Sequence, residues 1–321
     1  MGAADERLPE PVRRVVSQVF GTTVRSCRRP AVGSVAETYL LELEGDPERV
    51  VCKIGGTSVW TGAVIEPAVC RLVGNRTSLA VPDVLASGRF VDAGRTTATE
   101  TAAPLSRWAL YEYVDGESPD PWYSQCDRTV RRRLVSDAGS ILGRLHDWST
   151  TEFAFDRTGG LDRTPNHPTG LCVCDPTLPS VVDTLAAVSR VLPRRSPASQ
   201  AVLCHGDFHP GNLLVTSSGR ITAVLDWGNA HVAPAEYAVA RAEVRFIDRF
   251  RSLPSPERAW LREVFRARYR DHASLESNYP ARAPLYKSLW LAQSAINLAS
   301  VARSSRGRTQ IRRQLRTTVN R

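Results

Sequence analysis

Three side chains with oxygen donors lie in two short loops that follow strand-like segments. Residues 204–215 read Cys-His-Gly-Asp-Phe-His-Pro-Gly-Asn-Leu-Leu-Val, which places Asp207 and Asn212 between two apolar runs. A second apolar segment, residues 221–225, ends in Asp226. Asn212 and Asp226 offer oxygen ligands that suit Mg²⁺, and Asp207 can accept a proton from a hydroxyl group. The pattern predicts metal-assisted chemistry on a hydroxyl, although the same letters could form an acidic turn before a helix cap.

The spacing resembles the catalytic loop and metal-binding aspartate of the aminoglycoside phosphotransferase and choline kinase-like family. That family shares the protein-kinase fold, and its motif is H-G-D-x-x-x-x-N followed by a hydrophobic strand that ends in Asp. Here His205 and Gly206 precede Asp207. Protein kinases have His-Arg at that point, so the resemblance favours the small-molecule branch. It implies that Asp207 is the catalytic base and that Asn212 and Asp226 hold Mg²⁺.

Lysine is rare in this chain and occurs only at Lys53 and Lys287, whereas arginine is abundant. Lys53 lies in the third of three expected strands, at residues 24–28, 38–43 and 49–54. An ammonium group is a compact point charge, and a narrow phosphate pocket distinguishes it from a planar guanidinium. The family resemblance implies that Lys53 positions the α- and β-phosphates of ATP.

Two further segments near Lys53 match the family's nucleotide-binding lobe. Glu66 stands at the start of an expected helix, as its cap before a proline, and the resemblance makes it the ion-pair partner of Lys53. Glu37 is a second candidate for that partner. The resemblance also assigns Gly33 and Ser34 to the loop that covers the phosphates, although this short segment could equally be a hairpin turn.

Residues 108–117 resemble the family's fifth strand and the hinge that follows it. The resemblance implies that the backbone around Glu112, Tyr113 and Val114 binds the adenine edge of the nucleotide. Tyr113 could instead serve only to pack the hinge.

The remaining sequence predicts a mixture of helices and irregular segments. Apolar residues at helical spacing predict helices over 8–20, 126–150, 181–191 and 285–301. Residues 156–180 are rich in Pro, Gly, Asp and Thr and predict an irregular insertion. We therefore expect an α+β, bilobal protein-kinase-like fold. Residues 1–114 would form a small N-lobe with an antiparallel sheet and helix, and residues 115–321 a larger, mostly helical C-lobe.

Composition narrows the class of protein. No apolar run reaches the roughly 18 residues of a membrane helix, and the N-terminus lacks the apolar segment of a signal peptide, so we expect a cytoplasmic protein. The seven scattered cysteines are typical of small core residues in a reducing compartment. The net charge of +9 and the arginine-rich tail come with no recognition motif, so nucleic acid is an unlikely partner.

Together these features predict a small-molecule kinase that uses ATP and Mg²⁺ to phosphorylate a hydroxyl. The acceptor stays open between an aminoglycoside-type antibiotic, a sugar, an amino alcohol and an anionic alcohol. Residues 236–321 hold only seven acidic residues among many arginines, which weighs against a polycationic acceptor. A non-catalytic pseudokinase scaffold is the alternative, and a basic nucleic-acid-associated protein is a further one.

Overall fold

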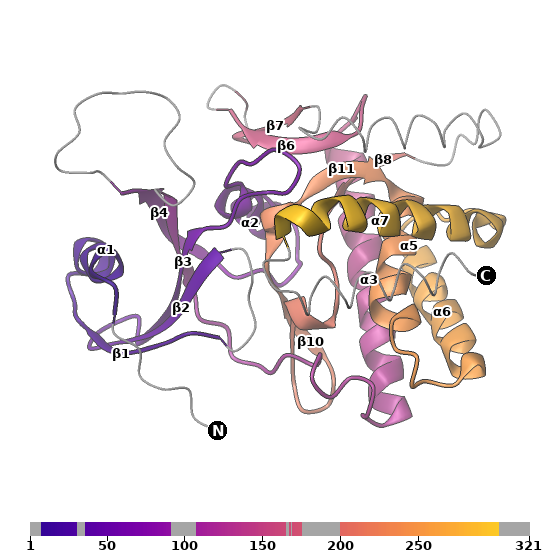
Figure 1. Cartoon of the computed structure of the whole chain (residues 1–321), viewed down its shortest axis with the longest axis horizontal. Helices are drawn as coiled ribbons and strands as arrows, with labels where there is room; N and C mark the ends of the chain where they lie inside the picture. The colour runs from indigo at the N-terminus through magenta and orange to yellow at the C-terminus, as the bar shows by residue number, and fades with distance from the viewer. Residues whose placement is uncertain are drawn as a thin grey trace.

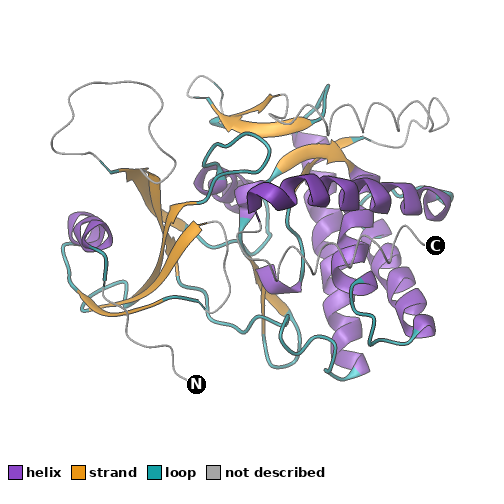
Figure 2. Ribbon diagram, viewed as in Figure 1, coloured by secondary structure: helices purple, strands orange, loops and turns teal. Residues whose placement is uncertain are grey.

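The N-terminal part of the chain forms a five-stranded antiparallel sheet (Figures 1 and 2). The computed structural model describes residues 8–30, 36–90, 107–164, 167, 169–174 and 200–301. In spatial order, the strands are β1 (Val24–Arg28), β2 (Ala36–Leu43), β3 (Arg49–Gly55), β5 (Arg107–Glu112) and β4 (Val84–Arg89). The three strands expected from the sequence before residue 55 are confirmed.

The two faces of this sheet belong to two hydrophobic cores, because successive side chains of a strand point to opposite sides. On β5, Leu110 packs into a core shared with α1 (Glu10–Phe20). Its neighbours Ala109 and Tyr111 pack instead into the main core, together with α2 (Glu66–Arg76). The sheet is therefore enclosed between α1 and the rest of the protein.

The helix expected over residues 8–20 is confirmed as α1. Its apolar face buries Val12, Val15 and Val16, as the spacing predicts. Gly21 ends the helix in the left-handed conformation at φ 65°, where its N–H donates to the carbonyl of Ser17.

The C-terminal part of the chain is mostly helical (Figure 2). Its main helices gather beside the sheet in Figure 1. They are α3 (Arg128–Glu152), α5 (Ala235–Glu243), α6 (Ser255–Arg270) and α7 (Tyr279–Val301), with a single π-helical stretch, η4 (Val244–Asp248), continuing α5. The predicted helices over 126–150 and 285–301 correspond to α3 and the greater part of α7.

Two smaller sheets carry the loops of interest. One is the hairpin of β9 (Leu213–Val215) and β10 (Ile221–Val224). The other has the order β7-β6-β11-β8 and is formed by β7 (Leu171–Cys174), β6 (Gly159–Arg163), β11 (His231–Pro234) and β8 (Ala201–Cys204).

The prediction of an irregular insertion at residues 156–180 is wrong for β6 and β7. These two strands pair in an antiparallel hairpin. Two adjacent glycines, Gly159 and Gly160, conceal the strand pattern in the sequence. A Cβ atom on Gly159 would overlap the carbonyl of Cys174, so the glycine is what lets the two backbones approach.

Several other expectations lie outside the described residues: the helix at 181–191, the phosphate loop at Gly33 and Ser34, and the basic tail. None of the helices within the described ranges is both long and apolar enough to span a bilayer. None of the seven cysteines, all of which lie within the described ranges, forms a disulfide, and Cys27, Cys52, Cys70 and Cys204 are buried.

Close packing of α3 on α6 generates the first prediction. A Cβ on Gly139 of α3 would lie 2.5 Å from the carbonyl oxygen of Phe265. We expect Gly139→Ala to lower the free energy of unfolding by about 1–3 kcal/mol, because the helices cannot separate without losing core contacts. Chemical denaturation measures the change.

Gly74 in α2 provides the matched control, since no atom lies within 4 Å of its would-be Cβ. Gly74→Ala should be neutral or stabilise by about 0.5–1 kcal/mol through helix propensity. Equal effects at the two positions would contradict the packing argument.

Candidate active site

The loop that carries Asp207 depends on a glycine turn directly after β8. Gly206 has φ 83°, a backbone conformation that L side chains rarely adopt. A Cβ on Gly206 would overlap the carbonyl oxygen of Asn229. This close approach lets the chain turn out of the buried strand and present Asp207 beside the loop that follows β10.

His205 joins the two loops through both ring nitrogens. Its Nδ1 accepts from the N–H of Asp207 at 3.1 Å, so the proton lies on Nε2, which donates to the carbonyl of Leu225 at 2.9 Å. The side chain is buried, and burial lowers the pKa of His205 to about 4. A neutral imidazole therefore fixes the Asp207 loop against the residue before Asp226.

Asn212 also links the Asp207 loop to the segment before Asp226. Its Nδ2 donates to the carbonyl of Asp207 at 2.9 Å, and its own carbonyl accepts from the N–H of Leu225 at 2.8 Å. Because the amide nitrogen is engaged, the side-chain oxygen is the atom available to a cation.

Asp226 has a strained backbone. It is the one non-glycine residue with positive φ, 64°, in the part of the chain that the structure describes. The left-handed conformation costs on the order of 1 kcal/mol, and such strain concentrates at functional sites. The conformation aims the carboxylate, which is 48% exposed, toward Lys53.

Asn212 and Asp226 together fit a magnesium ion. Mg²⁺ is commonly held by one or two protein oxygens, with phosphates and waters as the other ligands. The described residues contain no group of three or more His, Cys, Asp or Glu that could enclose a metal. Two oxygen donors at neighbouring loops agree with a metal that is shared with a phosphate substrate.

Lys53 connects the N-terminal sheet to the loop that carries Asp226. Its Nζ lies 2.6 Å from Oε1 of Glu66 and 3.7 Å from Oδ1 of Asp226. Burial would lower the pKa of Lys53, but the two carboxylates outweigh it and hold the pKa above its ordinary value. Lys53 is therefore charged at neutral pH.

Glu66 is the first residue of α2 rather than its cap, which is Ile65. Its side chain is only 8% exposed and also accepts a hydrogen bond from the backbone of Trp227. The other candidate partner of Lys53, Glu37, contacts Arg29 and Tyr39 instead.

The expected hinge follows β5 directly. Glu112 is the last residue of the strand, and its N–H donates to the carbonyl of Asp83. The ring of Tyr113 lies beneath the Arg49 guanidinium, with Cζ 4.3 Å from the ring centroid. Among the described residues, the backbone of Tyr113 and Val114 has no hydrogen-bond partner, so its polar groups are available to a ligand.

Two arginines that the sequence reasoning did not single out meet the Asp207 carboxylate. Oδ1 of Asp207 lies 2.9 Å from Arg245 and 3.7 Å from Arg241. Oδ2 lies 3.7 Å from Nε2 of His209, whose Nδ1 accepts from the N–H of Gly211. Burial would raise the pKa of Asp207, but the Arg245 cation and the nearby His209 hold it well below its usual range.

The spacing of these two arginines in the sequence could have identified them as a pair. Arg241 and Arg245 are four residues apart, which places them on one face of a helix. Glu236, near the start of α5, is paired with Arg282.

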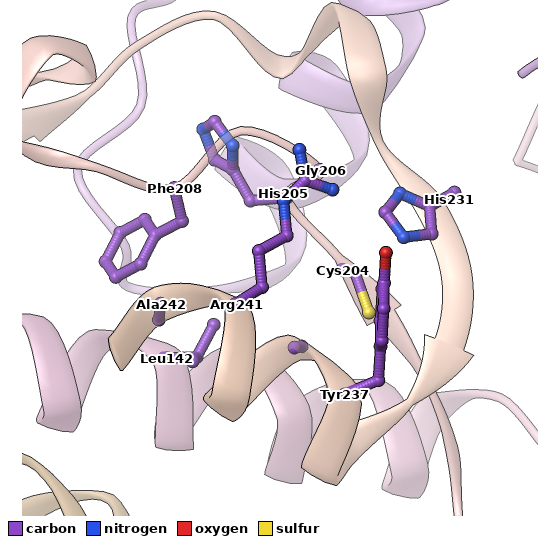
Figure 3. Close-up of a pocket in the computed structure, with 10 residues that line it drawn as sticks. Leu142, Cys204, His205, Gly206, Phe208, His231, Tyr237, Arg241 and Ala242 are labelled. Atoms are coloured by element: carbon purple, nitrogen blue, oxygen red, sulfur yellow. The ribbon is translucent and has the colours of Figure 1, made fainter. Parts of the chain in front are cut away.

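A small cavity lies behind the loop, between β8, β11 and α5 (Figure 3). Arg241 extends from α5 toward His205, and the Tyr237 hydroxyl points toward His231. The volume of about 10 Å³ is close to what one water molecule needs and is far too small for a substrate.

Comparison with known protein families identifies one match. The family model described as "Phosphotransferase enzyme family" matches residues 26–285. No curated protein sequence matches the chain.

Solved structures share the fold at low identity. A thermostable mutant of aminoglycoside phosphotransferase APH(4)-Ia, in its apo form, is 18% identical with a TM-score of 0.55, covering 95% of this chain and 99% of that one. Macrolide 2'-phosphotransferase MphH from Brachybacterium faecium is 16% identical with a TM-score of 0.55, covering 94% and 95%. Amicoumacin kinase hAmiN is 13% identical with a TM-score of 0.62, covering 97% and 93%. The expected α+β, protein-kinase-like fold is confirmed.

The buried histidines predict how stability depends on pH. Burial lowers the pKa of His205 to about 4 and those of His146 and His231 to about 3, against about 6.5 in an unfolded chain. The unfolded state therefore binds more protons below pH about 6.5, so the free energy of unfolding should fall as pH decreases from there. Each histidine contributes up to about 2 kcal/mol of this loss at pH 5.

Denaturant unfolding at several pH values measures the slope. His146→Gln removes one of these three groups and should reduce the slope between pH 6.5 and 5 by about a quarter to a third, since burial also lowers the pKa of His209. This holds whatever the effect of the substitution on stability at pH 7. An unchanged slope would show that His146 is not kept neutral in the folded protein.

Proposed function

Since the chain belongs to the phosphotransferase enzyme family, we propose that it transfers the γ-phosphoryl group of ATP to a hydroxyl of a small-molecule acceptor, with Mg²⁺ as cofactor. The observation that carries the proposal is one continuous set of contacts. Lys53 reaches Asp226, and the residue before Asp226 is bonded to Asn212 and His205, which both hold Asp207. Groups from three parts of the chain thereby surround one site.

Asp207 is the proposed catalytic base. The acceptor oxygen attacks the γ-phosphorus, the bond from that phosphorus to the bridging oxygen of ADP breaks, and the hydroxyl proton passes to the Asp207 carboxylate. Asn212 and Asp226 would hold Mg²⁺, which neutralises charge on the phosphates when bound. Placement and charge account for most of such catalysis.

Lys53 would position the α- and β-phosphates, with Glu66 holding the ammonium group in place. The available backbone at Tyr113 and Val114, next to Glu112, supports an adenine site at the hinge. Gly33 and Ser34 complete the proposal as the loop over the phosphates. In this proposal residues 1–114 form the nucleotide-binding lobe, and residues 115–321 supply the catalytic loop and acceptor helices.

The similar structures support ATP, a divalent metal and a small hydroxyl-bearing acceptor. One APH(4)-Ia structure is a ternary complex with AMP-PNP and hygromycin B. The hAmiN structure contains AMP-PNP, Ca²⁺ and Ami. A cytoplasmic location is part of the proposal, because that is where ATP is available.

Replacing the base tests the chemistry. We expect Asp207→Asn to lower kcat by about 10²–10⁴-fold, since it removes the proton acceptor but keeps the side chain's shape. Acceptor-dependent ADP release from ATP and Mg²⁺, over a panel of alcohols, measures the change. Nucleotide binding should persist in the variant. Wild type that binds ATP but turns over no alcohol would instead support a pseudokinase scaffold.

Replacing a metal ligand tests the cofactor. Asp226→Asn removes one of the two oxygen anions near Lys53, so we expect the Mg²⁺ concentration for half-maximal activity to rise at least about tenfold. A magnesium titration at saturating ATP measures this concentration. Asp83→Asn, in the segment directly before β4, is the control. An unchanged magnesium requirement would remove Asp226 from the metal site.

A further inference from the structure

The immediate surroundings of Asp207 carry more positive than negative charge. Arg241 and Arg245 share its Oδ1, at 3.7 and 2.9 Å. The nearby Arg249 is paired with Asp120. Three guanidinium groups therefore face two carboxylates. Burial and Arg245 lower the pKa of the neighbouring His209, which favours its neutral form.

We propose that the phosphoryl acceptor is an anionic alcohol, whose carboxylate or phosphate group is bound by Arg241 and Arg245 beside the base. The inference rests on the proposed function, because it takes Asp207 to be the group that the acceptor hydroxyl must touch. Any group within 4 Å of that carboxylate then lies next to the acceptor.

The burial of Arg241 and Arg245 indicates that their excess positive charge has a binding role. The side chains of Arg241 and Arg245 are only 16% and 21% exposed. The Nε of each is buried and forms no hydrogen bond to the described part of the protein. Guanidinium groups taken out of water without full pairing are costly, and a bound anion would supply the missing acceptors. Consistent with this, burial and the neighbouring arginines leave the pKa of Arg245 below its ordinary value despite Asp207.

The two arginines are also held in place for recognition. Both Cζ atoms lie 5.9 Å from the centroid of the Trp290 ring on α7. Arg245 sits in the π-helical stretch η4, and π-turns are frequent at functional sites. A planar guanidinium supported on an aromatic ring is suited to bidentate binding of a carboxylate or phosphate.

A cationic acceptor finds no unpaired carboxylate among the described residues from α5 to α7. All seven acidic residues between positions 236 and 276 are already in ion pairs with arginine or lysine. The pairs are Glu236–Arg282, Glu243–Arg266, Glu243–Lys287, Asp248–Arg262, Asp248–Lys287, Glu257–Arg131, Glu263–Arg266, Asp271–Arg268 and Glu276–Arg282. The helices therefore offer positive charge, and not negative charge, to the acceptor.

Binding of an anion is tested first, without turnover. Malonate serves as the probe in calorimetric titration of the full chain saturated with ADP and Mg²⁺. We expect binding to the wild type, and a loss of at least about tenfold in Arg241→Gln and Arg245→Gln, since each removes a charged hydrogen-bond donor. Arg268→Gln, an exposed arginine paired with Asp271, is the matched control and should bind like the wild type.

Arg245→Lys is the control for misfolding. It retains the positive charge, so it should bind malonate more tightly than Arg245→Gln does. Malonate binding that is absent from the wild type, or equal in the wild type and an Arg241→Gln/Arg245→Gln double variant, would overturn the proposal.

Turnover then distinguishes the bound groups. Glucuronate, glucose and glucosamine form one matched set of anionic, neutral and cationic alcohols, and 4-hydroxybutanoate, its amide and 4-aminobutanol form another. We expect the highest kcat/KM for the anion of a set, and Arg245→Gln should raise the KM for that acceptor while leaving the KM for ATP unchanged.

Two results would contradict the proposal that Arg241 and Arg245 bind the acceptor. One is a preference for the cationic member of a set. The other is a rise in the KM for ATP alone, which would assign the arginines to the γ-phosphoryl group. If no alcohol is phosphorylated while malonate still requires Arg241 and Arg245, the anion site stands and the proposed kinase activity fails.

Discussion

The contact between Lys53, Glu66 and Asp226 is the interaction on which the site depends. It joins β3, the first residue of α2 and the loop after β10, which lie far apart in the sequence. Lys53 and Glu66 are both largely buried, and removing one partner of a buried ion pair typically costs about 3–5 kcal/mol. The N-terminal sheet and the loops that carry Asp207 and Asp226 are thus held in one arrangement by this cluster of charges.

The loops around this cluster are fixed by backbone constraints rather than by many side-chain contacts. Gly206 has a conformation and a close approach that only glycine accommodates, and Asp226 is held with positive φ. A neutral His205 spans the gap between them. Each of these features costs some stability. Together they hold the proposed reacting groups in position before a substrate binds, and such preorganisation is a major source of enzymatic rate enhancement.

Local sequence was sufficient for the strands that flank the site and for the loops that present Asp207, Asn212 and Asp226. Apolar runs end at those positions, and glycine or proline marks each turn. The hairpin of β6 and β7 was missed because Gly159 and Gly160 have no side chains to show the alternation of a strand. The meeting of Asp207 with Arg245 was also missed, since it depends on how α5 and η4 pack against β8.

The two lysines have a practical consequence for chemical modification. Lys53 lies between Glu66 and Asp226, and Lys287 bridges Glu243 and Asp248, with side chains 18% and 14% exposed. Every other side-chain cation of the chain is an arginine or a histidine. Reagents that acylate amines will therefore find few targets in the folded protein beyond its terminus. Labelling of Lys53 by such a reagent would report whether the proposed phosphate site is open or occupied.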